Sequence, residues 1–549
     1  MTMLKIGKSK IFLGFCLSFM AGVGLGRYLN FPIMAVAAMV FLMLSTVWWS
    51  DKRFRLAGFL GLFLLLGAWR YQESFPKQAE NFIGKYYGQK IELEGIVVKD
   101  PDVRSDKVNL TVKPTTPSPQ PSPARGEGED GRTPTSPPPH EGEEKPATPP
   151  QPSPELPQPL FNKRGETVKG KLVGNILLNL GKYPEYQYGD RLKFSGKLEE
   201  PFVSEEFSYK NYLARYDTYA VMRFPKVEKL GSAQGSKIKA GLLSVKYRFQ
   251  SVLSRMLPEP HNALALGIIL GVKRSIPEDL KNALIAVGVS HIIVISGYNM
   301  SMITQTISRA RPVVGRRIAF LLSLLVVLGF VAMTGADASV VRAAIMAMLA
   351  VVALNVGRIY VSLNALVFVA GLMVLQNPKI LNFDVGFQLS FMATAGLIYL
   401  GSWFEARLRF LPNILEFRRN LASTLAAQIF VLPLLVFYFA RLSLISVVAN
   451  VLILWTVPYA MFFALIAGVS GMIFLPAGKL LAIVLWAILQ YQIWIVEFFA
   501  RIPFAQVAVS LPAAGLLIYY PLLFWKLRYL PRKNLLIFSH DHAPQEAKI

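Results

Sequence analysis

Three stretches of the sequence place polar or ionisable residues inside long apolar runs, and the first is residues 288–303. Its polar and small residues are His291, Ser296, Gly297 and Asn299. On a helix, His291 would share one face with Tyr298 and Gln305, because these residues repeat every seven positions. An ionisable group inside a membrane is costly and is a functional candidate by default. The alternative is that a neutral His291 only hydrogen-bonds a neighbouring helix.

The second stretch is residues 333–349, which contains Gly335, Ser339 and Arg342. Helical spacing puts Ser339, Arg342 and Met346 on one face. Moving a guanidinium into the centre of a membrane costs at least about 2.5 kcal/mol, so Arg342 requires a partner or a water-filled cavity. Asp337 and Asp384 are the candidate partners. The alternative is that Arg342 extends to the outer surface of the membrane.

The third stretch is residues 382–401, where Asp384 and Gln388 stand one helical turn apart. Further along, Asn450 interrupts another apolar run. Polar side chains of this kind are avoided on lipid-facing helices and are typical of helices that line a cavity or contact other helices. These residues therefore join the candidate channel residues.

The elements that must position these residues are transmembrane helices. The 549 residues are 53% hydrophobic and 17% charged, and their mean hydropathy is +0.41. The pattern predicts a polytopic α-helical membrane protein with about 12 spans. We expect them at residues 11–29, 31–49, 54–69, 283–307, 315–334, 338–356, 360–376, 385–403, 420–440, 443–470, 478–500 and 506–526.

The charges of the loops predict the orientation of these spans. With the N-terminus inside, the inner loops carry 20 Lys and Arg residues and the short outer loops carry 4. Positive residues accumulate on the cytoplasmic side, so both termini are expected there. The net charge of +24 is by itself weak evidence for a nucleic-acid partner, because most of it lies in these loops.

The segment after the third span reads as a water-soluble β domain outside the cytoplasm. Apolar and polar residues alternate in "QKIELEGIVVKDP", "KVNLTVKP" and "DRLKFSGKLEEP". Short alternating strands in so little sequence favour a small closed barrel of the OB type. A proline-rich insertion at 114–160 is expected to be disordered. Candidate single-strand contacts on the barrel are Tyr183, Tyr186, Tyr188, Arg191 and Lys193.

Two short helical stretches lead into the second group of spans. The stretch "SVKYRFQSVLSRML" is amphipathic, which predicts a helix on the membrane surface. The stretch "NALALGIILG" is too short to span, so we expect it to be re-entrant or buried against protein.

Several motifs in order resemble the ComEC family of competence proteins. They are "ALALGIILGVKRSIP", "HIIVISGYN", "TGADASVVRAAIMA", "NPKILNFDVGFQLSF" and "VLPLLVFYFARLSLISVVANVLILWTVP". "YGDRLKFSGKLEEP" and "EEFSYKNYLARYDTYAVM" look like the extracytoplasmic domain of that family. The resemblance implies an inner-membrane channel for single-stranded DNA in natural transformation. It also implies DNA-receptor and pilus components of a competence apparatus as partners, beside the lipid bilayer.

Two features depart from the family pattern. Tyr298-Asn299 stands where the family commonly has histidine, and Asn299 cannot titrate. The metallo-β-lactamase-like domain of many relatives is not expected here, since the tail offers only His540, Asp541 and His542. We therefore expect a transport channel that is not an enzyme, with no metal and no cofactor. The oligomeric state is not predicted.

The expected organisation is N-terminal transmembrane helices at 1–70, an extracytoplasmic OB-like domain at 71–235, a channel domain at 236–530 and a cytoplasmic tail at 531–549. The expected location is the bacterial cytoplasmic membrane. Two other functions fit the residues. A secondary transporter of a small anion or metabolite also uses interrupted helices with polar residues. A membrane-anchored binding protein would need the helices only as anchors, which the many intramembrane polar residues argue against.

Overall fold

The computed structural model describes residues 8–47, 49–76, 81–104, 107–115, 172–203, 208–272, 276–293, 300, 303–304 and 307–529. Ser296, Gly297, Asn299, the tail at 531–549 and most of the insertion at 114–160 lie outside the described residues.

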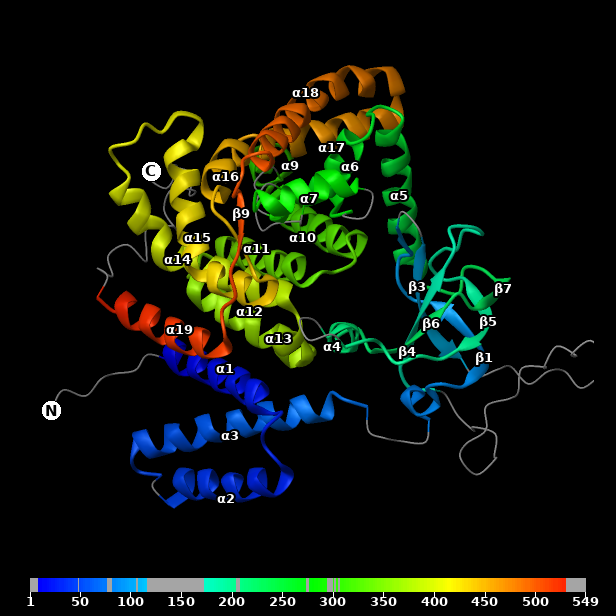
Figure 1. The fold of residues 1–549 in the computed structure, drawn as a ribbon. Helices are drawn as coiled ribbons and strands as arrows, with labels where there is room; N and C mark the ends of the chain where they lie inside the picture. The colour runs from blue at the N-terminus through cyan, green and yellow to red at the C-terminus, as the bar shows by residue number, and fades with distance from the viewer. Residues whose placement is uncertain are drawn as a thin grey trace, which may run out of the picture.

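Three apolar helices form the N-terminal part, drawn in blue in Figure 1. They are α1 (Lys8–Leu25), α2 (Phe31–Val47) and α3 (Lys52–Glu73). Glycines bring α1 and α3 into backbone contact: a Cβ atom on Gly22 would lie 1.8 Å from the Leu64 carbonyl oxygen, and one on Gly67 would lie 2.1 Å from that of Phe19. Small residues permit such close approach between membrane helices.

A mixed β-sheet follows, as the alternating pattern predicts. Its strands are β1 (Lys90–Val97), β2 (Asp102–Val103), β3 (Val108–Thr115), β4 (Asn175–Leu180), β5 (Arg191–Lys197), β6 (Thr218–Arg223) and β7 (Lys226–Gly231). The order is β6-β4-β3-β1-β5-β7, with β2 beside β3. All paired strands are antiparallel except β4 and β6, which are parallel. Leu110, Leu178 and Phe194 are fully buried in its core.

Among the described strands no closed barrel is seen, in contrast to the expectation. The path of paired strands stays open, and one isolated antiparallel bridge joins Glu199, just beyond β5, to Val221 in β6. Its two backbone hydrogen bonds are 2.8 and 2.9 Å long. Strand β3 also extends to Thr115, so the first residues of the segment expected as an insertion belong to the sheet.

The remaining chain is mostly helical, with η1 (Ile83–Tyr86) and α4 (Tyr209–Ala214) attached to the sheet. Its elements are α5 (Lys237–Ser254), α6 (His261–Leu270), α7 (Glu278–Ala286), η2 (Ser290–Ile293), α9 (Arg311–Val314), α10 (Arg316–Met333), α11 (Ala338–Val356), α12 (Ser362–Gln376), α13 (Lys379–Phe383), α14 (Val385–Arg407), η3 (Ile414–Glu416), α15 (Phe417–Phe439), β8 (Arg441–Ser443), α16 (Ser446–Leu454), α17 (Val457–Ile473), α18 (Leu475–Ala500), β9 (Gln506–Ala508) and α19 (Ala513–Leu527).

Six of the described helices are long and apolar enough to cross a membrane: α3, α10, α11, α14, α15 and α18. The pair α16 and α17, bent by 44°, would make a seventh span. Helices α1, α2, α12 and α19 are apolar but shorter. The chain is therefore a polytopic helical membrane protein, while the count of about 12 spans stays a prediction.

Two local expectations were wrong, and a third is not tested. No continuous helix runs from residue 283, because α7 ends at Ala286 and Gly288 adopts a φ of 75° before η2 begins. The segment expected as the last span opens with β9, and α19 starts only at Ala513. Helix α5 packs one face against protein, with Phe249 and Leu253 buried in the helical core, and its place on the membrane surface stays a prediction.

One short helix behaves as expected. All ten residues of α6 are buried, and nine of them belong to "NALALGIILG", so this stretch is buried against protein. It shares a core with α5, α17 and α18.

Candidate functional site

Arg342 lies in α11 with a buried side chain that is 8% exposed. Its Nε donates a hydrogen bond to Ser390 Oγ in α14 at 2.8 Å, and its Nη1 contacts Met346 Sδ at 3.6 Å. The guanidinium carbon lies 5.8 Å from the centre of the Phe391 ring. These partners are all neutral, so they position the cation without cancelling its charge.

Asp384 was one of the two predicted partners of Arg342, but the two residues do not pair. Asp384 is the N-cap of α14, where Oδ1 accepts from the Phe387 backbone N–H at 3.0 Å. Its Oδ2 forms an ion pair with the guanidinium of Arg215, which follows α4 in the sheet domain. The Arg215 guanidinium also stacks on Tyr212 and Tyr216, at 4.2 and 4.4 Å from their ring centres.

Lys379 makes a second contact with the sheet domain from the same turn. Its side chain is buried, and its Nζ donates to Asp217 Oδ1 and to the Tyr219 hydroxyl, both at 2.7 Å. Burial, followed by the charge of Asp217, raises the pKa of Tyr219 above its usual range, so this phenol stays protonated. Asn377 adds a hydrogen bond from Nδ2 to the Arg215 carbonyl at 2.8 Å.

We call this set of residues the docking cluster. Its members are Arg215, Asp217, Tyr219, Asn377, Lys379 and Asp384. Figure 1 shows α4 between the sheet and α13, which is the place where this cluster lies. The motif "NPKILNFD" therefore holds the sheet domain against the membrane helices. The charged "ARYD" segment, which supplies Arg215 and Asp217, is the sequence signal that could have indicated this cluster.

Helix α5 attaches the sheet domain at another place. Lys246 Nζ pairs with Asp100 Oδ2 at 2.7 Å, and the Tyr247 hydroxyl donates to Asp100 Oδ1. Lys239 Nζ donates to the Val98 carbonyl at 3.0 Å. Burial and the adjacent Asp100 raise the pKa of Tyr247 above its usual range, which keeps its proton available for this bond.

Gln388 connects three elements of the membrane part. Its Nε2 donates to the Leu381 carbonyl at 2.9 Å, and its Oε1 accepts from the Tyr438 hydroxyl at 2.6 Å. Gln388 thus ties α14 to α13 and α15.

The other predicted membrane residues lie on different elements. Gly335 has a φ of 85° in the turn between α10 and α11, and Ser339 is half-buried in the first turn of α11. His291 is exposed on η2. Asn450 is buried in α16, and no described residue hydrogen-bonds its Oδ1.

The five candidate DNA contacts have different environments. Tyr183 is 82% exposed, whereas Tyr186 is buried in the sheet core. The Tyr188 hydroxyl accepts from the Ser236 backbone N–H at 3.1 Å, and Lys239 Nζ lies 4.4 Å from its ring centre.

The two basic candidates are both paired with acids. Arg191 forms an ion pair with Glu94 and Lys193 with Glu92, each at 2.6 Å. Hydrogen bonding to Glu92, followed by its charge, raises the pKa of Lys193. These pairs make this strand less basic than its sequence indicates.

Long apolar helices precede and follow a small β-sheet in the chain, and a guanidinium is buried among them. This combination defines a polytopic membrane protein. Residues 268–533 match the family model described as "Competence protein". The chain is also 28% identical over 292 residues to "ComE operon protein 3" of Bacillus subtilis (strain 168). This alignment covers 52% of the chain and 36% of that relative. No solved structure matches significantly. The helical part of the chain at 268–533 is therefore a competence-family domain, the family that the motifs of the sequence indicate.

Proposed function

We propose that the protein is the inner-membrane channel that passes single-stranded DNA into the cytoplasm during natural transformation. The observation that carries this proposal is the buried Arg342, which lies within the matched residues 268–533 and has neutral partners. A passing phosphate would supply the opposite charge. Placing such a cation in a membrane costs about 2.5 kcal/mol even on lenient scales, and attraction to the phosphate would offset part of this cost.

The docking cluster supports an orientation in which the sheet domain faces outward. The cluster joins the domain to the turn between α12 and α14. Asp337 lies in the turn before α11. After burial, which is the main cause, its charge helps to raise the pKa of Tyr216 in the sheet domain, so this turn also lies near the domain. Arg316 and Arg317 stand at the opposite end of α10. By the positive-inside rule that end of α10 is cytoplasmic, and both termini of the chain would lie on the same side.

The sheet supports an OB-type domain that receives the strand. In the order β1, β3, β4, β6, β5 and back to β1, each strand pairs with the next, provided that the Glu199–Val221 bridge counts as the pairing of β6 with β5. OB-folds are five-stranded and partly open, which fits a ring joined at one point by a single bridge. Tyr183 is free to stack on a base, while Arg191 and Lys193 would have to exchange their glutamates for phosphates. DNA-receptor and pilus components are the proposed partners.

The test is DNA entry in a transformable host from which the gene has been deleted. The strain is complemented with the wild-type gene, with Arg342→Gln or with Arg342→Lys, and labelled DNA in the cytoplasm is measured. We expect Arg342→Gln to lower the rate about tenfold or more, which corresponds to about 1.4 kcal/mol. Arg342→Lys should retain more of the rate because it keeps the charge.

The matched control is Arg501→Gln, which removes an exposed cation at the end of α18 and should leave DNA entry unchanged. Membrane levels of each variant are compared by immunoblot. Normal entry in the deletion strain would rule out the channel. Undiminished entry with Arg342→Gln would instead assign Arg342 to the structure of the helix bundle.

A further inference from the structure

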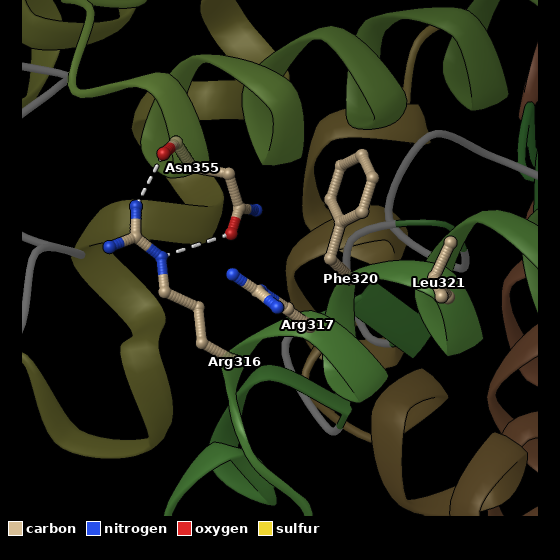
Figure 2. Close-up of a pocket in the computed structure, with 5 residues that line it drawn as sticks. All are labelled: Arg316, Arg317, Phe320, Leu321 and Asn355. Atoms are coloured by element: carbon tan, nitrogen blue, oxygen red, sulfur yellow. Dashed lines mark hydrogen bonds between the residues drawn. The ribbon is translucent and has the colours of Figure 1, made fainter.

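A hollow of about 470 Å³ lies between the start of α10 and the end of α11, away from the docking cluster. Its lining residues are Arg316, Arg317, Phe320, Leu321 and Asn355, all shown in Figure 2. It combines two adjacent cations with an apolar wall, and no lining residue is acidic. The proposed path for DNA does not account for it.

One of the two cations is held in place by the neighbouring helix. Arg316 Nε donates to Asn355 Oδ1 at 3.2 Å, and its Nη2 donates to the backbone carbonyls of Leu354, at 3.4 Å, and Asn355. These carbonyls belong to the last turn of α11, where backbone oxygens lack partners within the helix. The Arg316 guanidinium is therefore positioned without meeting a carboxylate.

The second cation is available to a ligand. Arg317 is exposed, and no described residue forms a hydrogen bond or an ion pair with its guanidinium. In Figure 2 this guanidinium lies between the Arg316–Asn355 pair and Phe320. The hollow thus presents positive charge that the described protein does not neutralise.

The apolar side of the hollow continues along the exposed surface of α10. Leu321, Leu325 and Leu328 are 61%, 69% and 51% exposed. Their spacing puts them on one face of a helix that is long and apolar enough to cross a membrane. In a bilayer this face contacts acyl chains, so the hollow opens where the acyl chains meet the headgroups.

We propose that this hollow binds the phosphodiester headgroup of an anionic phospholipid such as phosphatidylglycerol. Arg316 and Arg317 contact the phosphate, and an acyl chain follows Leu321, Leu325 and Leu328. Basic pockets between membrane helices on the cytoplasmic side are suited to such headgroups. The apolar wall favours a lipid over a nucleic-acid phosphate, which brings no hydrocarbon. The site requires only that α10 lies in a membrane, so it is independent of the DNA proposal.

The test measures lipid retention by the full-length protein. Wild type and variants are reconstituted in nanodiscs of phosphatidylcholine with a small fraction of phosphatidylglycerol. They are then released into mild detergent, and bound lipid is counted by intact-protein mass spectrometry. We expect wild type to retain phosphatidylglycerol about fivefold better than Arg317→Gln. Arg317→Lys should retain it nearly as well as wild type.

The matched control is Lys479→Gln, which removes an exposed cation in the first turns of α18 that does not line the hollow. It should retain phosphatidylglycerol like wild type. Equal retention of phosphatidylglycerol by wild type and Arg317→Gln would overturn the proposal. Retention of phosphatidylcholine by wild type as strong as that of phosphatidylglycerol would also overturn it. Inorganic phosphate and a single-stranded oligonucleotide are added as competitors. Complete displacement of the lipid by either one would assign the hollow to that ligand and overturn the lipid site.

Discussion

Asp384 makes two contacts that belong to different parts of the molecule. One carboxylate oxygen caps α14, and the other pairs with Arg215 of the sheet domain. Both side chains of the pair are at most 10% exposed. Removing one partner from a buried pair is strongly destabilising, because the remaining charge has no water to compensate it. The pair is therefore the most sensitive point of the docking cluster.

We expect Asp384→Asn to lower the free energy of unfolding by about 3 kcal/mol or more. Thermal unfolding of the full-length protein in detergent measures the effect. Glu416→Gln is the control, since Glu416 and Arg419 form an exposed pair at 4.0 Å and such pairs contribute about 0–1 kcal/mol. The double variant Asp384→Asn with Arg215→Gln should recover part of the loss. A loss no larger than that of Glu416→Gln would contradict the importance of the pair.

At the scale of the residue, the place of Arg342 within an apolar run indicated that it would need a partner, and the structure shows its side chain buried. The candidate partners were Asp337 and Asp384, whereas the structure shows Ser390 as the hydrogen-bond partner. Ser390 stands six residues after Asp384, which is about 9 Å along a helix. The choice between them depends on the relative height of α11 and α14, and helical periodicity carries no information on that offset.

At the scale of the elements, the break between α7 and η2 depends on a single glycine. Gly288 has a φ of 75°, and a Cβ atom there would lie 2.7 Å from Ser446 Cβ and 3.0 Å from Ser443 Cβ. The position thus excludes other residues both by backbone conformation and by close contact with α16 and the end of β8. A helix that ran on from α7 would displace this packing.

Gly288→Ala should destabilise the protein more than Gly357→Ala. Comparing the two variants separates the cost of close contact from the cost of the backbone conformation. Gly357 has a φ of 70° but no atom within 4 Å of an added Cβ, so its substitution carries only the conformational cost of about 1–2 kcal/mol. Thermal unfolding of both variants in detergent is the measurement. Adding Ser446→Gly to Gly288→Ala should remove part of the difference. Equal destabilisation by the two single variants would show that the contact with Ser446 is unimportant.

The strands and most helices were predictable because their patterns are local. The alternation in β1 predicted a strand whose buried residues alternate, and the structure has this pattern. The position of α5 was not predictable in the same way, because an amphipathic helix has the same pattern on a protein surface and on a membrane. Whether such a sheet closes depends on pairs between strands, such as Glu199 with Val221, and alternation along one strand does not report these pairs.

At the scale of the whole molecule, the sheet domain is attached through both the docking cluster and α5. Contacts at two places restrict rotation of the domain as well as its separation from the membrane helices. The proposed channel would then receive its substrate in one orientation.

Single cysteines in a Cys16→Ser background test the orientation of the molecule. Tyr183 and Val313 are 82% and 88% exposed and belong to the sheet domain and to α9. We expect a membrane-impermeant maleimide to label Tyr183→Cys in intact spheroplasts, and to label Val313→Cys only after permeabilisation. The opposite pattern would invert the proposed topology. Labelling of both cysteines after permeabilisation confirms that each is accessible.

The glycine contacts between α1 and α3 have a consequence for biogenesis. These helices touch through Gly22 and Gly67 of their own sequence, so their association requires no later part of the chain. Synthesis from Glu73 to Ser362, where α12 begins, covers about 290 residues and takes about 15–60 s at ordinary ribosomal rates. The N-terminal helices thus have time to assemble while the ribosome is still translating the rest. Helix α12, which packs against α1 through Val369 and Met373, then docks late onto a surface that already exists.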